Sequence, residues 1–170
     1  MLDADTEFLK LFSQQTLHLD LRRFGVIAAS FRLGAIEPGG GNVVDTTVPA
    51  GLASGLVPIS ERFFAGGDNS VRGYDYESLG PKDSNGEVAG GRYLVVGSAE
   101  YEHRLWGKWG AAVFYDAGNA LDAIDDKLKH GAGIGLRWQS PVGPVRVDVA
   151  SALSEDNNPL RLHVTVGSDL

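Results

Sequence analysis

The sequence predicts an all-β protein: an antiparallel up-and-down transmembrane β-barrel with one long loop. Three observations favour this fold class. Seven segments alternate strictly between apolar and polar residues, and short and long connections between these segments alternate along the chain. Glycine makes up 23 of the 170 residues, about twice its usual share, which disfavours long helices.

The seven segments have the two-residue period of strands with two unlike faces. They cover residues 16–22, 27–34, 92–104, 109–116, 131–139, 145–150 and 160–167. Residues 1–15 are an unassigned N-terminal lead-in, and residues 16–170 contain the expected barrel strands. The apolar faces, in chain order, are Leu17, Leu19 and Leu21; Ile27, Ala29, Phe31 and Leu33; Tyr93, Val95, Ala99 and Tyr101; Trp109, Ala111, Val113 and Tyr115; Ala132, Ile134, Leu136 and Trp138; Val145, Val147 and Val149; Leu160, Leu162, Val164 and Val166.

The connections are of two kinds. Short ones lie at residues 23–25, 105–108 and 140–144, and the prolines of the last cannot continue a strand ladder. Long ones cover residues 37–91, 117–130 and 151–159. Short turns on one rim and long loops on the other are typical of outer-membrane barrels. The 37–91 connection is far longer than an ordinary loop, which indicates a function of its own.

The residues of the polar face and of the strand ends indicate whether the apolar face points outward to lipid or inward to the barrel interior. A soluble lipocalin-type barrel has the same alternation with its apolar face inward, and it stays open as an alternative. Aromatic residues near the expected strand ends, Trp109, Trp138 and Tyr93, instead favour interfacial girdles in a membrane. The polar face also mixes charges of both signs, which suits a water-filled lumen: Arg92, Glu100, Glu102, Arg104, Arg137, Arg146, Asp148 and Arg161.

Composition excludes several classes of function. The chain has no cysteine, so it has no disulfide framework, thiolate zinc site or cysteine nucleophile. Its 22 Asp and Glu against 15 Lys and Arg argue against a nucleic-acid partner. No segment approaches the ~20 apolar residues of a spanning helix, and acidic residues follow Met1 where an export signal would carry positive charge.

No pattern of catalytic or metal-ligating residues is evident, so we expect no enzyme activity, metal or cofactor. The four histidines are scattered without metal-ligand spacing, and no nucleophile elbow is present. Glu100 and Glu102 could be paired carboxylates for acid–base chemistry. Their position on the polar face favours instead a charge network with Arg92 and Arg104.

Three separated motifs resemble a known family. The first is the loop tip Val71, Arg72, Gly73 and Tyr74; the second is Phe114, Asp116 and Gly118; and the third covers residues 131–148. Together they are similar to the outer-membrane assembly and translocation barrels, which include BamA, TamA and the two-partner secretion transporters. The run at residues 63–68 and the ending at 167–170 look most like the TamA branch.

The resemblance implies a sixteen-stranded barrel in the bacterial cell outer membrane, of which this chain supplies about seven C-terminal strands. It implies a barrel that inserts or secretes client proteins such as autotransporters, without covalent chemistry, and opens between its first and last strands. Implied partners are outer-membrane lipid, client outer-membrane proteins and a periplasm-spanning TamB-like protein. Alternatives are a passive pore or structural barrel, a barrel enzyme such as a lipase, a soluble lipid carrier, or a non-functional truncated fragment.

The resemblance implies that the long loop, residues 37–91, folds into the lumen and plugs it. Asp116 lies on the polar face of its segment, so Arg72 at a folded-in tip could reach it and clamp it through two hydrogen bonds. Gly73 would allow a tight turn, and Tyr74 would anchor the tip to the wall. Three glycines at successive polar-face positions would leave room for the plug: Gly131, Gly133 and Gly135.

Overall fold

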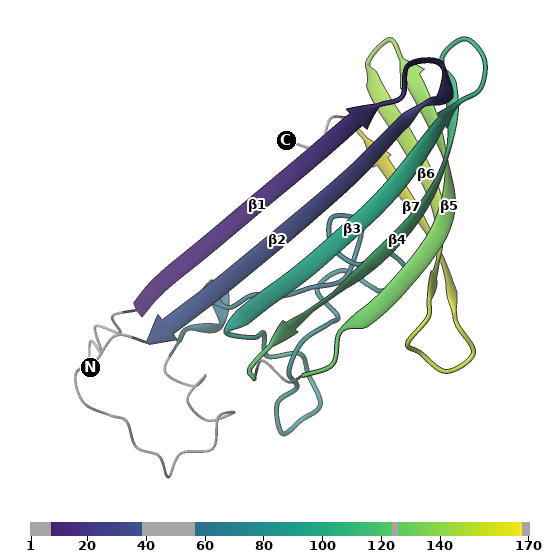
Figure 1. Cartoon of the computed structure of the whole chain (residues 1–170). Helices are drawn as coiled ribbons and strands as arrows, with labels where there is room; N and C mark the ends of the chain where they lie inside the picture. The colour runs from purple at the N-terminus through teal and green to yellow at the C-terminus, as the bar shows by residue number, and fades with distance from the viewer. Residues whose placement is uncertain (1–7, 39–56, 124–125, 168–170) are drawn as a thin grey trace.

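The computed structural model describes residues 8–38, 57–123 and 126–167, and in this part of the chain seven strands form one antiparallel sheet in sequence order (Figure 1). The predicted all-β, up-and-down fold is confirmed. Two single-turn 3₁₀ segments, η1 (Arg22–Phe24) and η3 (Ile59–Glu61), accompany the strands. The strands are β1 (Phe8–Asp20), β2 (Val26–Pro38), β3 (Tyr93–Arg104), β4 (Trp109–Leu121), β5 (Lys129–Ser140), β6 (Gly143–Ala152) and β7 (Leu160–Val166).

The sheet is curved, and the long β2–β3 connection lies against its concave side (Figure 1). The short turns gather at one end of the strands and the longer connections at the other. Near the short turns Trp109 pairs with Trp138 across β4 and β5, and their rings stack with centroids 5.6 Å apart. Among the described residues, no helix has the length and apolar character needed to cross a membrane.

Most strands are longer than the alternation predicts, and β1 differs most from its predicted segment. β1 begins at Phe8, although the sequence pattern places its start at Thr16 and leaves residues 1–15 as a lead-in. Polar residues 13–15 fall on both faces and hide the pattern, while backbone pairing with β2 continues from Asp20 to Phe8. β4 likewise continues to Leu121, which pairs with Tyr93 at the start of β3. Residues 1–7 lie outside the described part of the chain.

The two faces of the sheet differ in what covers them. Apolar side chains on the convex face are exposed, as for Ile134 and Leu162, which are 64% and 67% exposed. On the concave face, strand residues and residues of the long β2–β3 connection together form the buried core. Apolar residues facing outward and a packed interior beneath them are the arrangement of a barrel wall whose outer solvent is lipid. The core residues are Ile36, Val57, Phe63, Ala65, Val71, Tyr74, Leu79, Leu94, Val96, Ala120 and Ala152.

Candidate functional site

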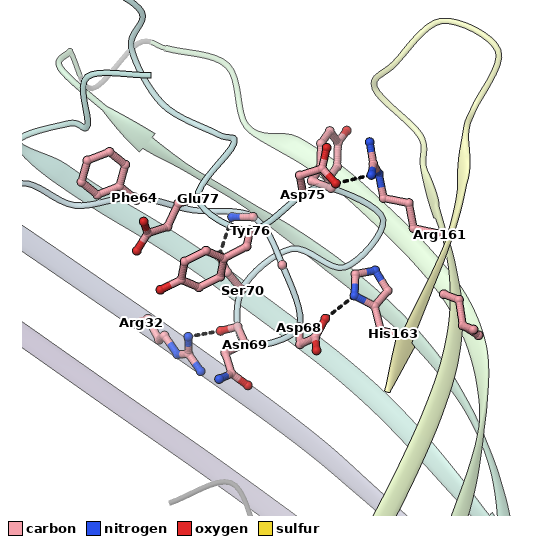
Figure 2. Close-up of a pocket in the computed structure, with 14 residues that line it drawn as sticks. Arg32, Phe64, Asp68, Asn69, Ser70, Asp75, Tyr76, Glu77, Arg161 and His163 are labelled. Carbon is pink, nitrogen blue, oxygen red and sulfur yellow. Dashed lines mark hydrogen bonds and ion pairs between the residues drawn. The ribbon is translucent and has the colours of Figure 1, made fainter. Parts of the chain in front are cut away.

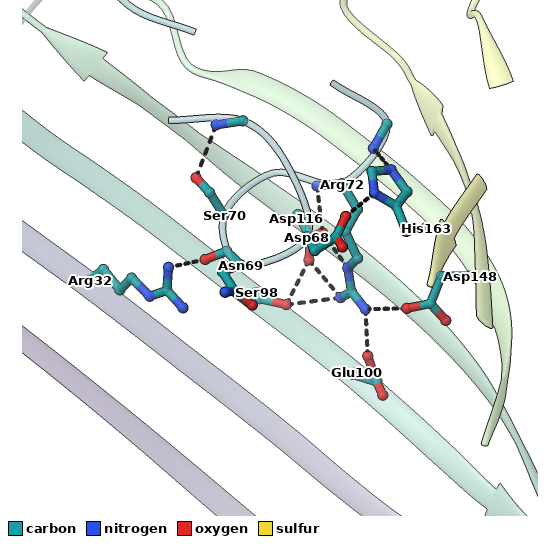
Figure 3. A network of polar contacts seen from close by, with 12 residues as sticks. Arg32, Asp68, Asn69, Ser70, Arg72, Ser98, Glu100, Asp116, Asp148 and His163 are labelled. Atoms are coloured by element: carbon teal, nitrogen blue, oxygen red, sulfur yellow. Dashed lines mark hydrogen bonds and ion pairs between the residues drawn. The ribbon is translucent and has the colours of Figure 1, made fainter. Parts of the chain in front are cut away.

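The described part of the long connection, residues 57–92, folds into a compact plug loop. Three isolated bridges hold it in shape: Phe63 with Gly91, Ala65 with Leu79, and Lys82 with Val88. Gly66 and Gly67 have φ of 101° and 92°, a region that residues with a side chain rarely adopt. The bridges and this glycine pair direct residues 68–76, the tip of the plug loop, toward the concave face of the sheet (Figure 3).

At the tip, Arg72 clamps Asp116 of β4 (Figure 3). Its Nε donates to Oδ2 at 2.8 Å and its Nη2 donates to Oδ1 at 2.9 Å, while the Arg72 backbone N–H donates to Oδ2 at 3.1 Å. The side chain of Asp116 is completely buried. The contact expected from the two motifs is therefore present, in the bidentate geometry that arginine allows.

The clamp extends into a larger charge cluster on the lumen wall. Arg72 Nη1 donates to Glu100 Oε2 at 2.7 Å and to Asp148 Oδ2 at 3.3 Å. Arg137 of β5 binds the same two carboxylates, donating from Nη2 to Glu100 Oε1 at 2.8 Å and from Nη1 to Asp148 Oδ1. Ser98 supplies its hydroxyl to Asp116 Oδ1 at 2.6 Å. Two arginines thus bridge three carboxylates from β3, β4 and β6.

The expected pairing of Glu100 with Arg92 and Arg104 is wrong. Arg104 binds Asp20 across the exposed rim at 3.3 Å, and Arg92 donates to the backbone carbonyl of Asp122 at 3.2 Å. Four residues along a strand correspond to about 13 Å, so Arg104 lies too far along β3 from Glu100. The polar-face alternation was sufficient to place Glu100 in the lumen, but its partners depend on the neighbouring strands and the plug loop.

The surroundings of Arg72 keep it charged. Burial by itself would lower the pKa of Arg72, but its hydrogen bond to Asp116 and the charges of Asp116 and Glu100 outweigh that effect and raise the pKa above its ordinary value. The guanidinium carbon also lies 3.4 Å from the centroid of the Phe114 ring, a cation–π contact. The tip therefore places the positive charge of Arg72 against the carboxylates of the wall.

The three β5 glycines make room for three different groups. A Cβ at Gly131 would overlap the backbone carbonyl oxygen of Arg72, so this glycine lies directly under the plug. At Gly133 a Cβ would meet the Val149 carbonyl oxygen of β6 and the Phe114 ring, and at Gly135 it would meet the carboxylate of Asp148. Of the three glycines predicted to make room for the plug, Gly131 therefore lies under the plug backbone, Gly133 beside the Phe114 ring and Gly135 beside the charge cluster.

Backbone fit also explains two motif glycines elsewhere. Gly73 has φ of 97°, and a Cβ there would lie 2.8 Å from the backbone carbonyl carbon of Ser151. At Gly118 a Cβ would lie 2.7 Å from the carbonyl oxygen of Val95 on the adjacent strand. These positions exclude a side chain, the first because of the plug's approach to β6 and the second because of close β3–β4 packing.

The rest of the tip anchors the plug to β5 and to the β6–β7 connection. Val71 is fully buried in the core. Tyr74 is also buried, and its hydroxyl donates to the His130 carbonyl at 3.2 Å and accepts from the Ser154 backbone N–H at 3.3 Å. The ring of Tyr74 is therefore packed in the core, while its hydroxyl makes two hydrogen bonds to the backbone.

Contacts between the tip and β7 were not predicted. His163 of β7 binds Asp68, and Arg161 of the same strand binds Asp75; both pairs border a cavity of about 750 Å³ between the plug loop and the wall (Figure 2). The alternation places both β7 side chains inward, but their partners lie about ninety residues away in sequence. The positions of these residues in the sequence therefore did not predict the two contacts.

The charge cluster does not have the features of a catalytic centre. Each carboxylate in it is occupied by an arginine, so none of the three is placed as a free general base. Across residues 8–38, 57–123 and 126–167, no group of three or more His, Asp or Glu side chains could hold a metal ion. What the cluster does chemically is fix the position of a loop against a wall.

A curved sheet with apolar side chains outward, and a plug loop clamped by an arginine to its inner face, defines a plugged transmembrane β-barrel wall. The chain belongs to the Omp85 superfamily, whose domain matches residues 1–169. The outer-membrane localisation predicted from the sequence is confirmed by relatives that are named as outer membrane proteins. The branch of the superfamily, and the TamA-like ending at residues 168–170, which lies outside the described part of the chain, stay predictions.

Several known proteins resemble this chain. The outer membrane protein assembly factor BamA of Nitratidesulfovibrio vulgaris is 35% identical over 109 residues, covering 59% of this chain and 14% of that protein. Outer envelope protein 80 of the Arabidopsis thaliana chloroplast is 34% identical over 119 residues, covering 63% of this chain and 15% of that protein. The chain spans about one seventh of the length of these relatives.

A solved structure has the same fold. BamA from Haemophilus ducreyi lacking POTRA domains 1–3 matches with a TM-score of 0.71 and 22% identity, over 97% of this chain and 35% of that one. The match covers nearly every residue of this chain but about a third of the other, so the seven strands correspond to part of a larger barrel.

Proposed function

We propose that this chain forms the C-terminal part of an outer-membrane barrel that assembles or inserts other outer-membrane proteins. The observation that carries the proposal is the clamped tip: Arg72 joins the plug loop to Asp116, Glu100 and Asp148 on three wall strands. A passive pore or structural barrel would have the same strands but would not need the clamped tip at residues 71–74. Membership of the Omp85 superfamily and the naming of two relatives as assembly factors support the same function.

The barrel acts by holding and presenting strands, without covalent chemistry. The plug loop holds β3 to β6 in one register through the charge cluster. The sheet edges, β1 and β7, each pair with a single neighbour among the described strands. A client strand would add to such an edge by backbone hydrogen bonding. Outer-membrane lipid is the second partner, in contact with the exposed apolar face.

Within this class we propose the TamA-like role, with autotransporter clients and a periplasm-spanning TamB-like partner. The support is the run of residues 63–68, which places Phe63 and Ala65 in the core and Gly66 and Gly67 at the bend that leads into the tip. Deleting a gene for a TamB-like protein should reproduce the phenotype of Arg72→Ala. Normal autotransporter display in that deletion strain would favour the BamA-like role instead.

The function is tested by replacing Arg72 at the native locus. Arg72→Ala should reduce the amount of heat-modifiable, folded outer-membrane proteins, while the barrel itself stays in the outer membrane. The matched control is Arg104→Ala, which removes a half-exposed arginine of β3 whose partners among the described residues are Asp20 and a backbone carbonyl. Normal client assembly in the Arg72→Ala strain, together with a raised ion conductance in planar bilayers, would indicate a passive pore.

A further inference from the structure

The edge strand β7 is joined to the plug loop by a histidine whose two ring nitrogens are both used. The Gly73 backbone N–H donates to His163 Nε2 at 3.0 Å, and His163 Nδ1 binds the carboxylate of Asp68 (Figure 3). The side chain is only 8% exposed. Because Nε2 accepts a hydrogen bond, the ring proton belongs on Nδ1, where it is donated to Asp68.

This histidine holds the residue that follows the clamped arginine. Gly73 comes directly after Arg72, and its backbone is packed so closely against Ser151 and Ala152 that no side chain would fit. A shift of β7 relative to the tip would therefore leave the buried Gly73 N–H without an acceptor, which costs more than an exposed hydrogen bond. Since Arg72 is fixed by β4, the ring connects the edge strand to the centre of the wall.

A second contact lies two residues away on the same face of β7. Arg161 binds Asp75, on the other side of the tip from Asp68 (Figure 2). Arg161 and Asp75 are more exposed than His163, at 40% and 63% for their side chains. Exposed ion pairs contribute little, so the buried histidine contributes the larger part of this connection.

We propose that His163 is a positioning residue that couples the edge strand β7 to the clamped tip of the plug loop. The coupling requires one acceptor and one donor on the same side chain, directed at Gly73 and Asp68. While this contact is intact, the edge strand and the plug keep one relative position; breaking it releases β7 from the tip. This goes beyond the proposed function, because it assigns a connection between two elements whatever the barrel assembles.

The test measures the distance between the two elements in the intact protein reconstituted in lipid. The chain contains no cysteine, so spin labels can be placed on Tyr76→Cys at the exposed side of the tip and on Leu162→Cys at the lipid-facing side of β7. His163→Gln keeps one acceptor and one donor and should retain the single distance of the parent. His163→Leu and His163→Lys lack the acceptor and should show a second, longer distance population.

Two further variants keep the proposal falsifiable if a β7 substitution prevents folding. Asp68→Leu removes the other partner from an exposed loop position and should also produce the longer population. Thr165→Val, a lumen-facing change on β7 outside the contact, should leave the distance unchanged. Parental distances in both His163→Leu and Asp68→Leu would overturn the coupling. Because the readout is a distance, this result is independent of any measurement of client assembly.

Discussion

The Arg72–Asp116 pair dominates the site because Asp116 has no contact with solvent. A fully buried carboxylate must be matched by charged donors, and Asp116 receives two hydrogen bonds from the guanidinium and one from the Arg72 backbone. Breaking such a pair leaves a buried charge uncompensated, which costs more than the intact pair contributes. The sequence predicted both residues because each lies in a short motif, and the alternation placed Asp116 inward.

A double-mutant cycle measures this pair. Arg72→Ala and Asp116→Ala should each lower the free energy of unfolding of the intact protein in lipid by about 3–5 kcal/mol, and the double variant should lose less than the sum. Urea unfolding followed by tryptophan fluorescence gives the three values. The exposed pair Arg104 and Asp20 is the control, with a coupling expected below about 1 kcal/mol. Additive losses for Arg72 and Asp116 would contradict the clamp.

Adding one methyl group at Gly131 tests whether this residue makes room for the plug. Gly131→Ala places a Cβ against the carbonyl oxygen of Arg72 and should displace the plug, lowering the free energy of unfolding by about 1–3 kcal/mol. The control is Gly97→Ala on β3, where the added Cβ would lie 3.4 Å from the Phe31 ring, an ordinary contact. Protease digestion of the plug loop and thermal unfolding compare the two. Equal thermal stability and equal protease resistance of Gly131→Ala and Gly97→Ala would argue against close packing of the plug on Gly131.

At the scale of elements, each strand has one face for lipid and one for the plug. The two-residue period predicted these faces because side chains alternate along any strand, whatever lies beside it. It did not predict the start of β1, because residues 13–15 interrupt the pattern and only pairing with β2 continues the strand. The ends of strands depend on the neighbouring backbone, which the sequence pattern does not contain.

A lysine scan of the two faces tests their assignment. Ile134→Lys, near the middle of β5 on the exposed apolar face, should lower the free energy of unfolding in lipid by about 2–4 kcal/mol. Ser30→Lys, at a lumen-facing position of β2, is the control and should change it far less, because the lumen contains water and polar groups. Urea unfolding in vesicles measures both. A larger loss for Ser30→Lys would mean that the faces are reversed.

For the whole molecule, the described strands form an open sheet whose edges are β1 and β7. An open edge leaves backbone N–H and C=O groups unpaired, which is costly in lipid. The plug loop contacts β7 through the side chains of His163 and Arg161. At β1 the described contacts with the plug include an ion pair, Lys10 to Glu61 at 3.4 Å, the stacking of Phe12 on Phe63, and the Lys10 ammonium over the Phe63 ring.

Hydrogen exchange should show this asymmetry in the 170-residue chain held in detergent micelles. Amides of β4, which has two neighbours and the charge cluster on its inner face, should exchange slowly, while amides of β1 should exchange fastest among the strands. Mass spectrometry of peptides from the two strands compares them under one condition. Equal protection of β1 and β4 would mean that another strand covers the β1 edge.

The sequence by itself determined the strand faces, the plugged outer-membrane barrel class and the Arg72–Asp116 contact. The strand faces follow from a local pattern, because a side chain's face depends on its parity along the strand. The barrel class and the Arg72–Asp116 contact follow from three separated motifs that resemble one family. Only the tertiary structure decided that Glu100 and Asp148 share Arg72 with Asp116, that Arg137 joins them, and that His163 holds the plug to the edge strand. Those contacts depend on strand register and on where a long loop returns to the wall, and both are set by packing between segments far apart in the chain.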